Sequence, residues 1–88
     1  LIDCLTLWLS NHLINKNNLD EKIDELITTL INSKSDIVLV SNEVGTGIVP
    51  DNSLAREFRD NAGFMNQKVA LVSDEVYWVV AGIQTQIK

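Results

Sequence analysis

A short apolar run lies between two segments with helical periodicity, and it limits the possible folds more than any other feature. The run is Ile37-Val38-Leu39-Val40, which is mostly β-branched and lacks the alternation of a half-exposed strand. It stops abruptly at the polar residues Ser41-Asn42-Glu43. Such a run is typical of a strand covered on both faces, as in a parallel sheet. A second run of this kind, residues 76–81, stops at Gly82.

Two segments before residue 37 carry helical patterns. Residues 5–14 are expected to form a helix with one apolar face: Leu5, Trp8, Leu9 and Leu13. After a polar loop, Asn18 is the expected N-cap of a second helix that ends near Ser33, and Glu21 completes the spacing of a capping box. Its apolar stripe comprises Leu19, Ile23, Leu26, Ile27, Leu30 and Ile31.

A third helix is expected from the cluster Asp51-Asn52-Ser53, any of which can cap it, to about Ser73. Gly63 lies inside this pattern and costs the helix about 1 kcal/mol relative to alanine. A close packing contact would explain it. Residues 83–88 alternate between apolar and polar, as in a short edge strand.

Strands that alternate with helices indicate a single α/β domain over residues 1–88, with parallel central strands. Leu1-Ile2-Asp3 has the character of the end of a strand that begins upstream. Two and a half strands are few for a sheet, since typical sheets have four to six. We therefore expect the chain to be a fragment of a larger domain; a processed chain or a complete small protein is the alternative.

Composition narrows the possible partners. The chain has 88 residues, with 12 acidic against 7 basic side chains and a net charge of −5. The basic residues are scattered, which argues against binding to nucleic acid or to an anionic membrane surface. One cysteine cannot form an internal disulfide, so a reduced, cytoplasmic protein is expected. No apolar run approaches the roughly 20 residues of a membrane span.

Asp3 is the main candidate for a functional residue. In open α/β sheets, ligands bind beyond the carboxyl ends of the strands, and a carboxylate there can hold Mg²⁺ and a nucleotide. The alternative is an exposed residue that starts a turn or caps the next helix. Asn42 and Glu43 follow the other expected parallel strand at the same edge, as do Gly45 and Gly47.

A connection that binds no ligand explains these four residues equally well. Gly45-Thr46-Gly47 is neither a dinucleotide fingerprint nor a P-loop, because the third glycine and the Gly-Lys-Ser/Thr element are missing.

The remaining chemistry-bearing residues favour structural interpretations. His12 is expected at the surface, and Cys4 is expected to be a small buried residue rather than a nucleophile. Arg56 can pair with Asp60 on a solvated helix face, although Arg56 or Arg59 reaching a phosphate or a neighbouring subunit is the alternative. Trp8 and Trp78 are expected in the core or an interface.

Several longer stretches carry a specific resemblance. They include Asp3-Cys4-Leu5-Thr6-Leu7-Trp8, Ser41-Asn42-Glu43-Val44-Gly45, Gly47-Ile48-Val49-Pro50, 54–63, Asn66-Gln67 and 79–83. Together they resemble the C-terminal half of the bifunctional adenosylcobinamide kinase/adenosylcobinamide-phosphate guanylyltransferases of cobalamin biosynthesis. The resemblance covers nearly the whole chain except the 18–36 region. Residues 84–86 depart from it, since relatives often have a less polar stretch there.

The resemblance implies a P-loop NTPase fold of the RecA-like type, a mostly parallel sheet in a three-layer α/β/α sandwich. It implies phosphorylation of adenosylcobinamide with GTP or ATP, then GMP transfer from GTP through a GMP–histidine intermediate, in a cytoplasmic homotrimer. Asp3 matches the family's acidic position that contacts nucleotide or Mg²⁺. Asn42 and Glu43 match the family's Ser-Asn-Glu-Val-Gly segment, which implies that they border the site or take part in subunit contacts. Trp8, Arg56 and Arg59 are candidates for trimer contacts.

The P-loop and the GMP-accepting histidine belong to the absent half, so no catalytic residue carries over and the fragment alone is expected to be inactive. His12 is not that histidine. The alternative is a noncatalytic α/β interaction or oligomerisation module whose partner strands come from another chain.

Overall fold

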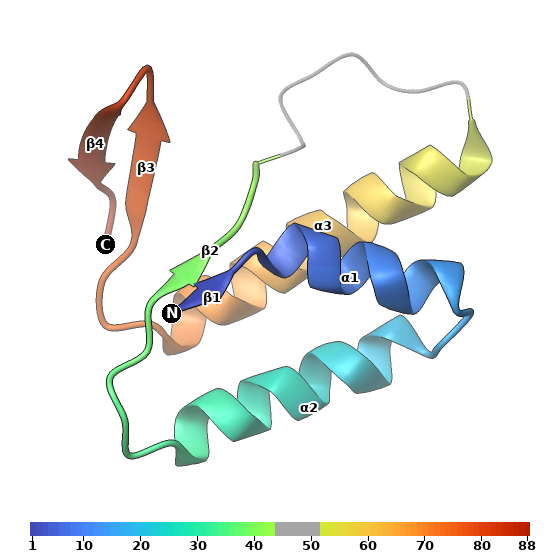
Figure 1. Cartoon of the computed structure of the whole chain (residues 1–88), viewed down its shortest axis with the longest axis horizontal. Helices are drawn as coiled ribbons and strands as arrows, with labels where there is room; N and C mark the ends of the chain where they lie inside the picture. Colours follow the sequence, from blue (N-terminus) through green and yellow to red (C-terminus); the bar gives the residue numbers. More distant parts are fainter. Residues whose placement is uncertain (44–51) are drawn as a thin grey trace.

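The computed structural model describes residues 1–43 and 52–88, which form three helices and two small sheets (Figure 1). The helices are α1 (Leu5–Ile14), α2 (Leu19–Asn32) and α3 (Ser53–Val72). The strands are β1 (Ile2–Asp3), β2 (Leu39–Val40), β3 (Tyr77–Val80) and β4 (Ile83–Gln86). Strand β1 pairs with β2, and β3 pairs with β4.

The helix ends confirm the capping signals in the sequence. The Asn18 side chain accepts a hydrogen bond from the backbone N–H of Glu21 at 3.2 Å, and α2 follows directly. Asn52 caps α3 through its side-chain oxygen, which accepts from the N–H groups of Leu54 and Ala55. Both contacts satisfy amide groups that have no partner within the first helical turn.

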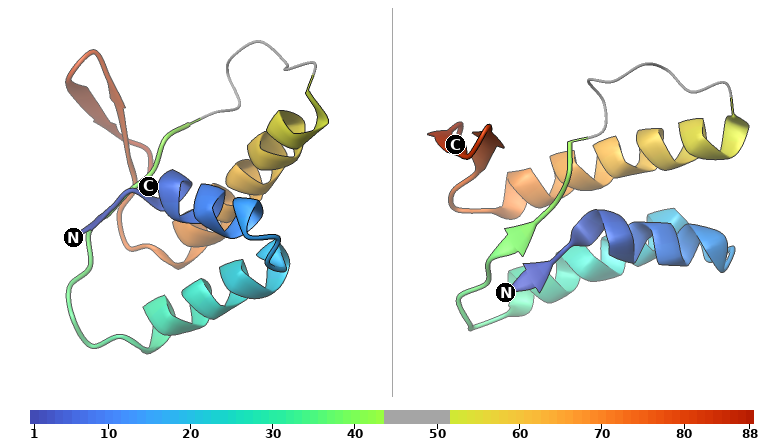
Figure 2. Two further views of the ribbon diagram at one scale, coloured as in Figure 1. Left: turned by 45° about the vertical axis from the view of Figure 1, so that its right-hand side comes forward. Right: turned by 45° about the horizontal axis from the view of Figure 1, so that its top comes forward.

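The three helices pack against one another, as two further views show (Figure 2), and the core lies between them. Each helix contributes buried apolar side chains: Leu5 and Leu9 from α1, Leu19 and Ile23 from α2, and Ala62, Met65 and Val69 from α3. Trp8, Leu13 and Leu39 pack against this cluster and are partly buried. The expected apolar face of α1 is therefore confirmed.

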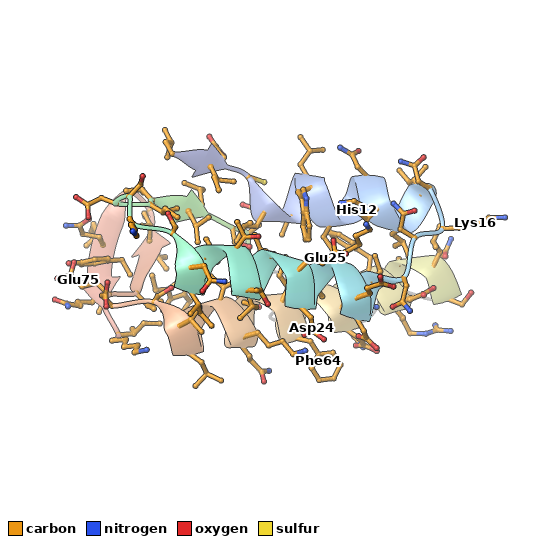
Figure 3. All side chains as sticks on the ribbon, turned by 90° about the horizontal axis from the view of Figure 1, so that it is seen from below. His12, Lys16, Asp24, Glu25, Phe64 and Glu75 are labelled. Atoms are coloured by element: carbon orange, nitrogen blue, oxygen red, sulfur yellow. The ribbon has the colours of Figure 1, made fainter. Side chains whose placement is uncertain are left out.

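The outer faces of α2 and α3 are polar or exposed (Figure 3). Lys68 on α3 pairs with Asp24 on α2 at 3.1 Å, but both side chains are exposed, so the pair contributes little to stability. Phe64 points away from the core, and Ile31, which we expected on the apolar stripe of α2, is 63% exposed. The stripe is narrower than its periodicity predicts.

The parallel pairing that we expected is present, but the strands are short and open. Ile2 pairs with Leu39 and Asp3 with Val40, in parallel. Within the described residues, helices cover only one face of this pair. Leu39 faces the core, whereas Val38 and Val40 are 61% and 41% exposed. The prediction of a strand buried on both faces is wrong for this chain, because two strands are too narrow to form a layer between helices.

The second apolar run is also exposed. All four residues of β3 are open to solvent, and β3 forms an antiparallel hairpin with β4. Ala81 and Gly82 have φ angles of 51° and 75°, the positive pair that a type I′ turn requires. Sequence reasoning expected β3 as a buried strand and missed the hairpin, because Ala-Gly is a weaker signal for this turn than Asn-Gly.

Gly63 has open space where a side chain would project. A Cβ atom built there meets nothing within 4 Å, so the close contact that we expected is absent among the described residues. Substituting alanine (G63A) is therefore expected to stabilise the chain by about 0.5–1 kcal/mol, since glycine loses more backbone entropy in a helix. Urea unfolding of the chain measures this difference. A loss of stability in G63A would contradict the open environment.

Candidate functional site

The carboxyl ends of β1 and β2 meet the start of α1 at one edge of the parallel pair. Asp3 is the last residue of β1 and lies opposite Val40, the last residue of β2. After β2 the chain continues as Ser41-Asn42-Glu43. After β1 it continues through Cys4 into α1. We call this group, Asp3, Cys4, Thr6 and Ser41 to Glu43, the carboxyl-edge cluster.

The structure thus places the three predicted site residues at the same edge of the sheet. Asp3, Asn42 and Glu43 are all exposed there. Gly45 and Gly47 lie outside the described residues. Carboxylates and amides at such an edge, near the positive end of the α1 dipole, suit a phosphate-bearing ligand and its cation.

Hydrogen bonds connect the carboxyl-edge cluster to α1 and α3. They involve two residues, Thr6 and Asn66, that were not predicted as part of the site. Asn42 Nδ2 donates to Thr6 Oγ1 at 3.2 Å, and Thr6 Oγ1 lies 2.9 Å from Cys4 Sγ. Asn66 of α3 accepts from Ser41 Oγ at 2.6 Å and donates to the Asn42 carbonyl at 3.2 Å. Asn66 and Thr6 stood out only within the family resemblance.

The thiol of Cys4 is affected by this network. An amide nitrogen can only donate, so Thr6 Oγ1 accepts from Asn42 and keeps its hydroxyl proton, with which it can donate to Cys4 Sγ and stabilise the thiolate. This hydrogen bond, helped by backbone N–H groups at the start of α1, lowers the pKa of the Cys4 thiol. Cys4 is partly exposed, not buried as we expected.

Alkylation tests this arrangement. The pH midpoint of the reaction of Cys4 with iodoacetamide is expected below 9.0, the ordinary thiol value, because the hydroxyl stabilises the thiolate. Thr6→Val removes that donor and should move the midpoint upward, whereas Thr6→Ser keeps it. A midpoint that is the same in the valine variant would show that Thr6 does not donate to the sulfur.

The other candidates lie apart from this edge. The His12 ring packs edge-on against Trp8, with ring centroids 4.7 Å apart, and its Nδ1 is 2.7 Å from Asn17 Nδ2. Arg59 pairs with its neighbour Asp60 at 3.1 Å. Trp78 is 52% exposed on β3. Among residues 1–43 and 52–88, no three His, Cys, Asp or Glu side chains gather closely enough to hold a metal ion by themselves.

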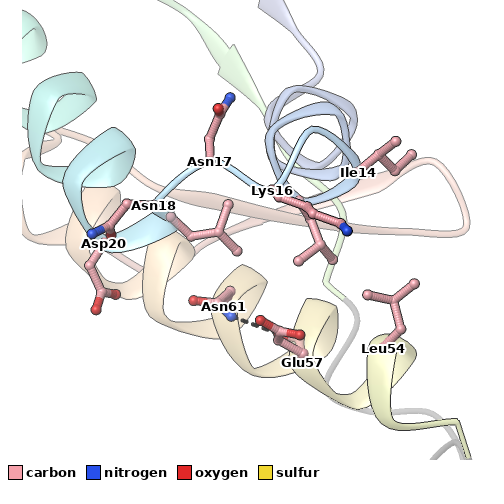
Figure 4. A pocket seen from close by; sticks show the side chains of 10 residues that line it. Ile14, Lys16, Asn17, Asn18, Asp20, Leu54, Glu57 and Asn61 are labelled. Carbon is pink, nitrogen blue, oxygen red and sulfur yellow. Dashed lines mark hydrogen bonds between the residues drawn. The ribbon is translucent and has the colours of Figure 1, made fainter.

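A groove of about 780 Å³ lies at the opposite end of α1 (Figure 4). Ile14, Lys16 and Asp20 line one side, and Leu54 and Glu57 of α3 line the other. The 10 residues of α1 place it about 15 Å from the carboxyl-edge cluster. The residues that line this groove do not combine an acid, a base and a nucleophile. The carboxyl-edge cluster is therefore the stronger candidate for a functional site.

None of the helices within the described residues has the length and apolar character that crossing a membrane requires.

The parallel strand pair and its helices make this an α/β protein, with polar residues beyond the carboxyl ends of both strands. Sequence comparison is more specific. The sequence model of the cobinamide kinase / cobinamide phosphate guanyltransferase family matches residues 1–87. The chain belongs to this family.

Curated relatives agree with this assignment. The bifunctional adenosylcobalamin biosynthesis protein CobU of Salmonella typhimurium is 41% identical over 103 residues, covering all of this chain and 57% of the relative. The bifunctional adenosylcobalamin biosynthesis protein CobP of Pseudomonas aeruginosa is 40% identical over 90 residues, and the alignment covers 52% of that protein. CobU of Escherichia coli is 37% identical over 103 residues, with 57% of that protein covered. The chain spans about half the length of the curated relatives it matches.

Proposed function

We propose that the complete protein carries out two steps of cobalamin biosynthesis. It phosphorylates adenosylcobinamide with GTP or ATP, and it then transfers GMP from GTP to adenosylcobinamide phosphate. Family membership supports this activity. The structural observation that carries it is the convergence of Asp3, Asn42 and Glu43 beside the start of α1.

In this proposal Asp3 contacts the nucleotide, directly or through Mg²⁺, and Asn42 and Glu43 border the site. The residues fit such an ion: Mg²⁺ typically takes one or two protein carboxylates and completes its shell with water and substrate phosphates. Asp3 is exposed at the strand end, where a phosphate can share the ion with it. When bound, Mg²⁺ would neutralise phosphate charge during transfer.

We further propose that these residues are the C-terminal half of a P-loop domain of the RecA-like type, with three α/β/α layers. The exposed Val38 and Val40, and the open ladder of β1, would be covered by strands and helices of the other half. The sequence contains no Gly-Lys-Ser or Gly-Lys-Thr element, so this half alone should catalyse neither reaction. We also propose a cytoplasmic homotrimer, in which Trp8, Arg56 and Arg59 are candidates for subunit contacts.

The gene sequence and one assay test the proposal. The residues encoded upstream should include a strand, a Gly-Lys-Ser/Thr loop, and a histidine between that loop and Asp3. The complete protein, incubated with labelled GTP and adenosylcobinamide phosphate, should become covalently labelled with GMP and form adenosylcobinamide-GDP. If the gene lacks both elements and the protein shows no transfer, a noncatalytic module that completes its sheet with another chain becomes the better explanation.

A further inference from the structure

Three elements that are distant in the sequence meet just beyond the end of β2. The side chain of Asn66, on α3, holds two consecutive residues: its Oδ1 accepts from Ser41 Oγ at 2.6 Å, and its Nδ2 donates to the Asn42 carbonyl at 3.2 Å. From the other side, Thr6 of α1 accepts from Asn42 Nδ2 at 3.2 Å. Asn42 is therefore held by one side chain from each of two helices.

Burial makes the contact with Thr6 costly to lose. Thr6 is 4% exposed, and among the described residues it is the only buried side chain that is polar. A buried hydroxyl is tolerated when its hydrogen bonds are satisfied, and an unmade bond at such a site carries a desolvation penalty. Since its partners are Asn42 and Cys4, the bonds of Thr6 tie the start of α1 to the end of β2.

Backbone pairing alone does not hold this segment. The parallel ladder ends at the Asp3–Val40 pair, so Ser41 and Asn42 lie beyond the last paired residues. Both residues are exposed. Their position relative to Asp3 is then set by the side chains that bind them, namely Thr6 and Asn66.

We propose that Thr6 and Asn66 are positioning residues of the nucleotide site. They hold Asn42 at a fixed place beside Asp3, so that the edge is formed before the ligand binds. This inference rests on the proposed function, since it deepens the account of the same site. Neither residue is assigned contact with the nucleotide. Their effect is transmitted through Asn42.

Steady-state kinetics of the complete protein test the proposal. Asn66→Ala and Thr6→Val are each expected to raise the KM for GTP about tenfold, the effect of one lost hydrogen bond in a preformed site. Their kcat values should change much less. Because both residues act through Asn42, the double variant should show about the same loss as either single variant rather than the product of the two. Thr6→Ser, which keeps the hydroxyl, should restore the KM.

Matched variants separate positioning from general damage. Gln67→Ala alters an exposed neighbour on α3 and should leave the KM unchanged. Asn66→Asp preserves shape but replaces the donor that faces the Asn42 carbonyl, so it should raise the KM even if the alanine variant folds poorly. An unchanged KM in Asn66→Asp and Thr6→Val, or multiplicative losses in the double variant, would overturn the inference while leaving the function intact. Absence of any transfer in the unmodified complete protein would overturn both.

Discussion

Replacing Asp3 with asparagine is expected to lower both transfer activities of the complete protein by about 100-fold, the upper range for disturbing the ligands around a catalytic ion. Asparagine has nearly the same shape but no negative charge, so the change removes attraction for a cation without creating a cavity. Asp3 lies at the end of β1, level with the last residue of β2, where a phosphate-bound ion would sit. Nucleotide affinity measured by titration calorimetry with and without Mg²⁺ should fall most when the ion is present.

Asp36→Asn is the matched control for this experiment. It makes the same charge change in the segment that precedes β2, at the amino end of the same strand pair. Both transfer activities should be unchanged in this variant. If Asp3→Asn also binds nucleotide and turns over like the unmodified protein, Asp3 has no part in the site.

Truncating Leu9 to alanine is expected to destabilise the chain by about 3 kcal/mol, measured as a lower urea midpoint of unfolding. Leu9 is fully buried and lies where α1 meets the other two helices. The loss combines reduced burial of apolar surface with a cavity that three helices cannot easily close. In a domain whose total stability is typically about 5–10 kcal/mol, this change leaves a large unfolded population near room temperature in mild denaturant.

Leu71→Ala is the control for that cavity. Leu71 is 78% exposed, near the end of α3, so the same truncation there should change stability by less than about 0.5 kcal/mol. Equal losses at Leu9 and Leu71 would show that the core does not lie between the three helices.

The helices were predictable because their signals are local. The caps at Asn18 and Asn52, and the apolar face containing Leu5 and Leu9, depend on residues within a few positions of one another. The burial of the strands was not predictable in this way. A run such as 37–40 indicates what a strand is suited to, whereas its burial depends on strands and helices supplied by other segments.

The candidate site was predictable only where it depends on the order of the strands and helices. Asp3, Asn42 and Glu43 could be placed at one edge from the order of strands and helices, since parallel strands end at the same side. Asn66 could not, because it lies in the middle of a helix, 24 residues from Asn42, and only the packing of α3 brings the two together. The roles of Asp3, Asn42 and Glu43 in the site are predictions that the experiments above test.

The hairpin formed by β3 and β4 gives this chain a second, local unit of cooperative unfolding. Its ladder joins residues close in sequence, and its ties to the helices run through one end: Lys88 Nζ donates to the carbonyls of Ala70 and Leu71, at 2.8 and 3.1 Å, at the last turn of α3. Opening the hairpin therefore exposes little of the helical core. Its amides should exchange with solvent through local opening, at a free energy well below that of global unfolding.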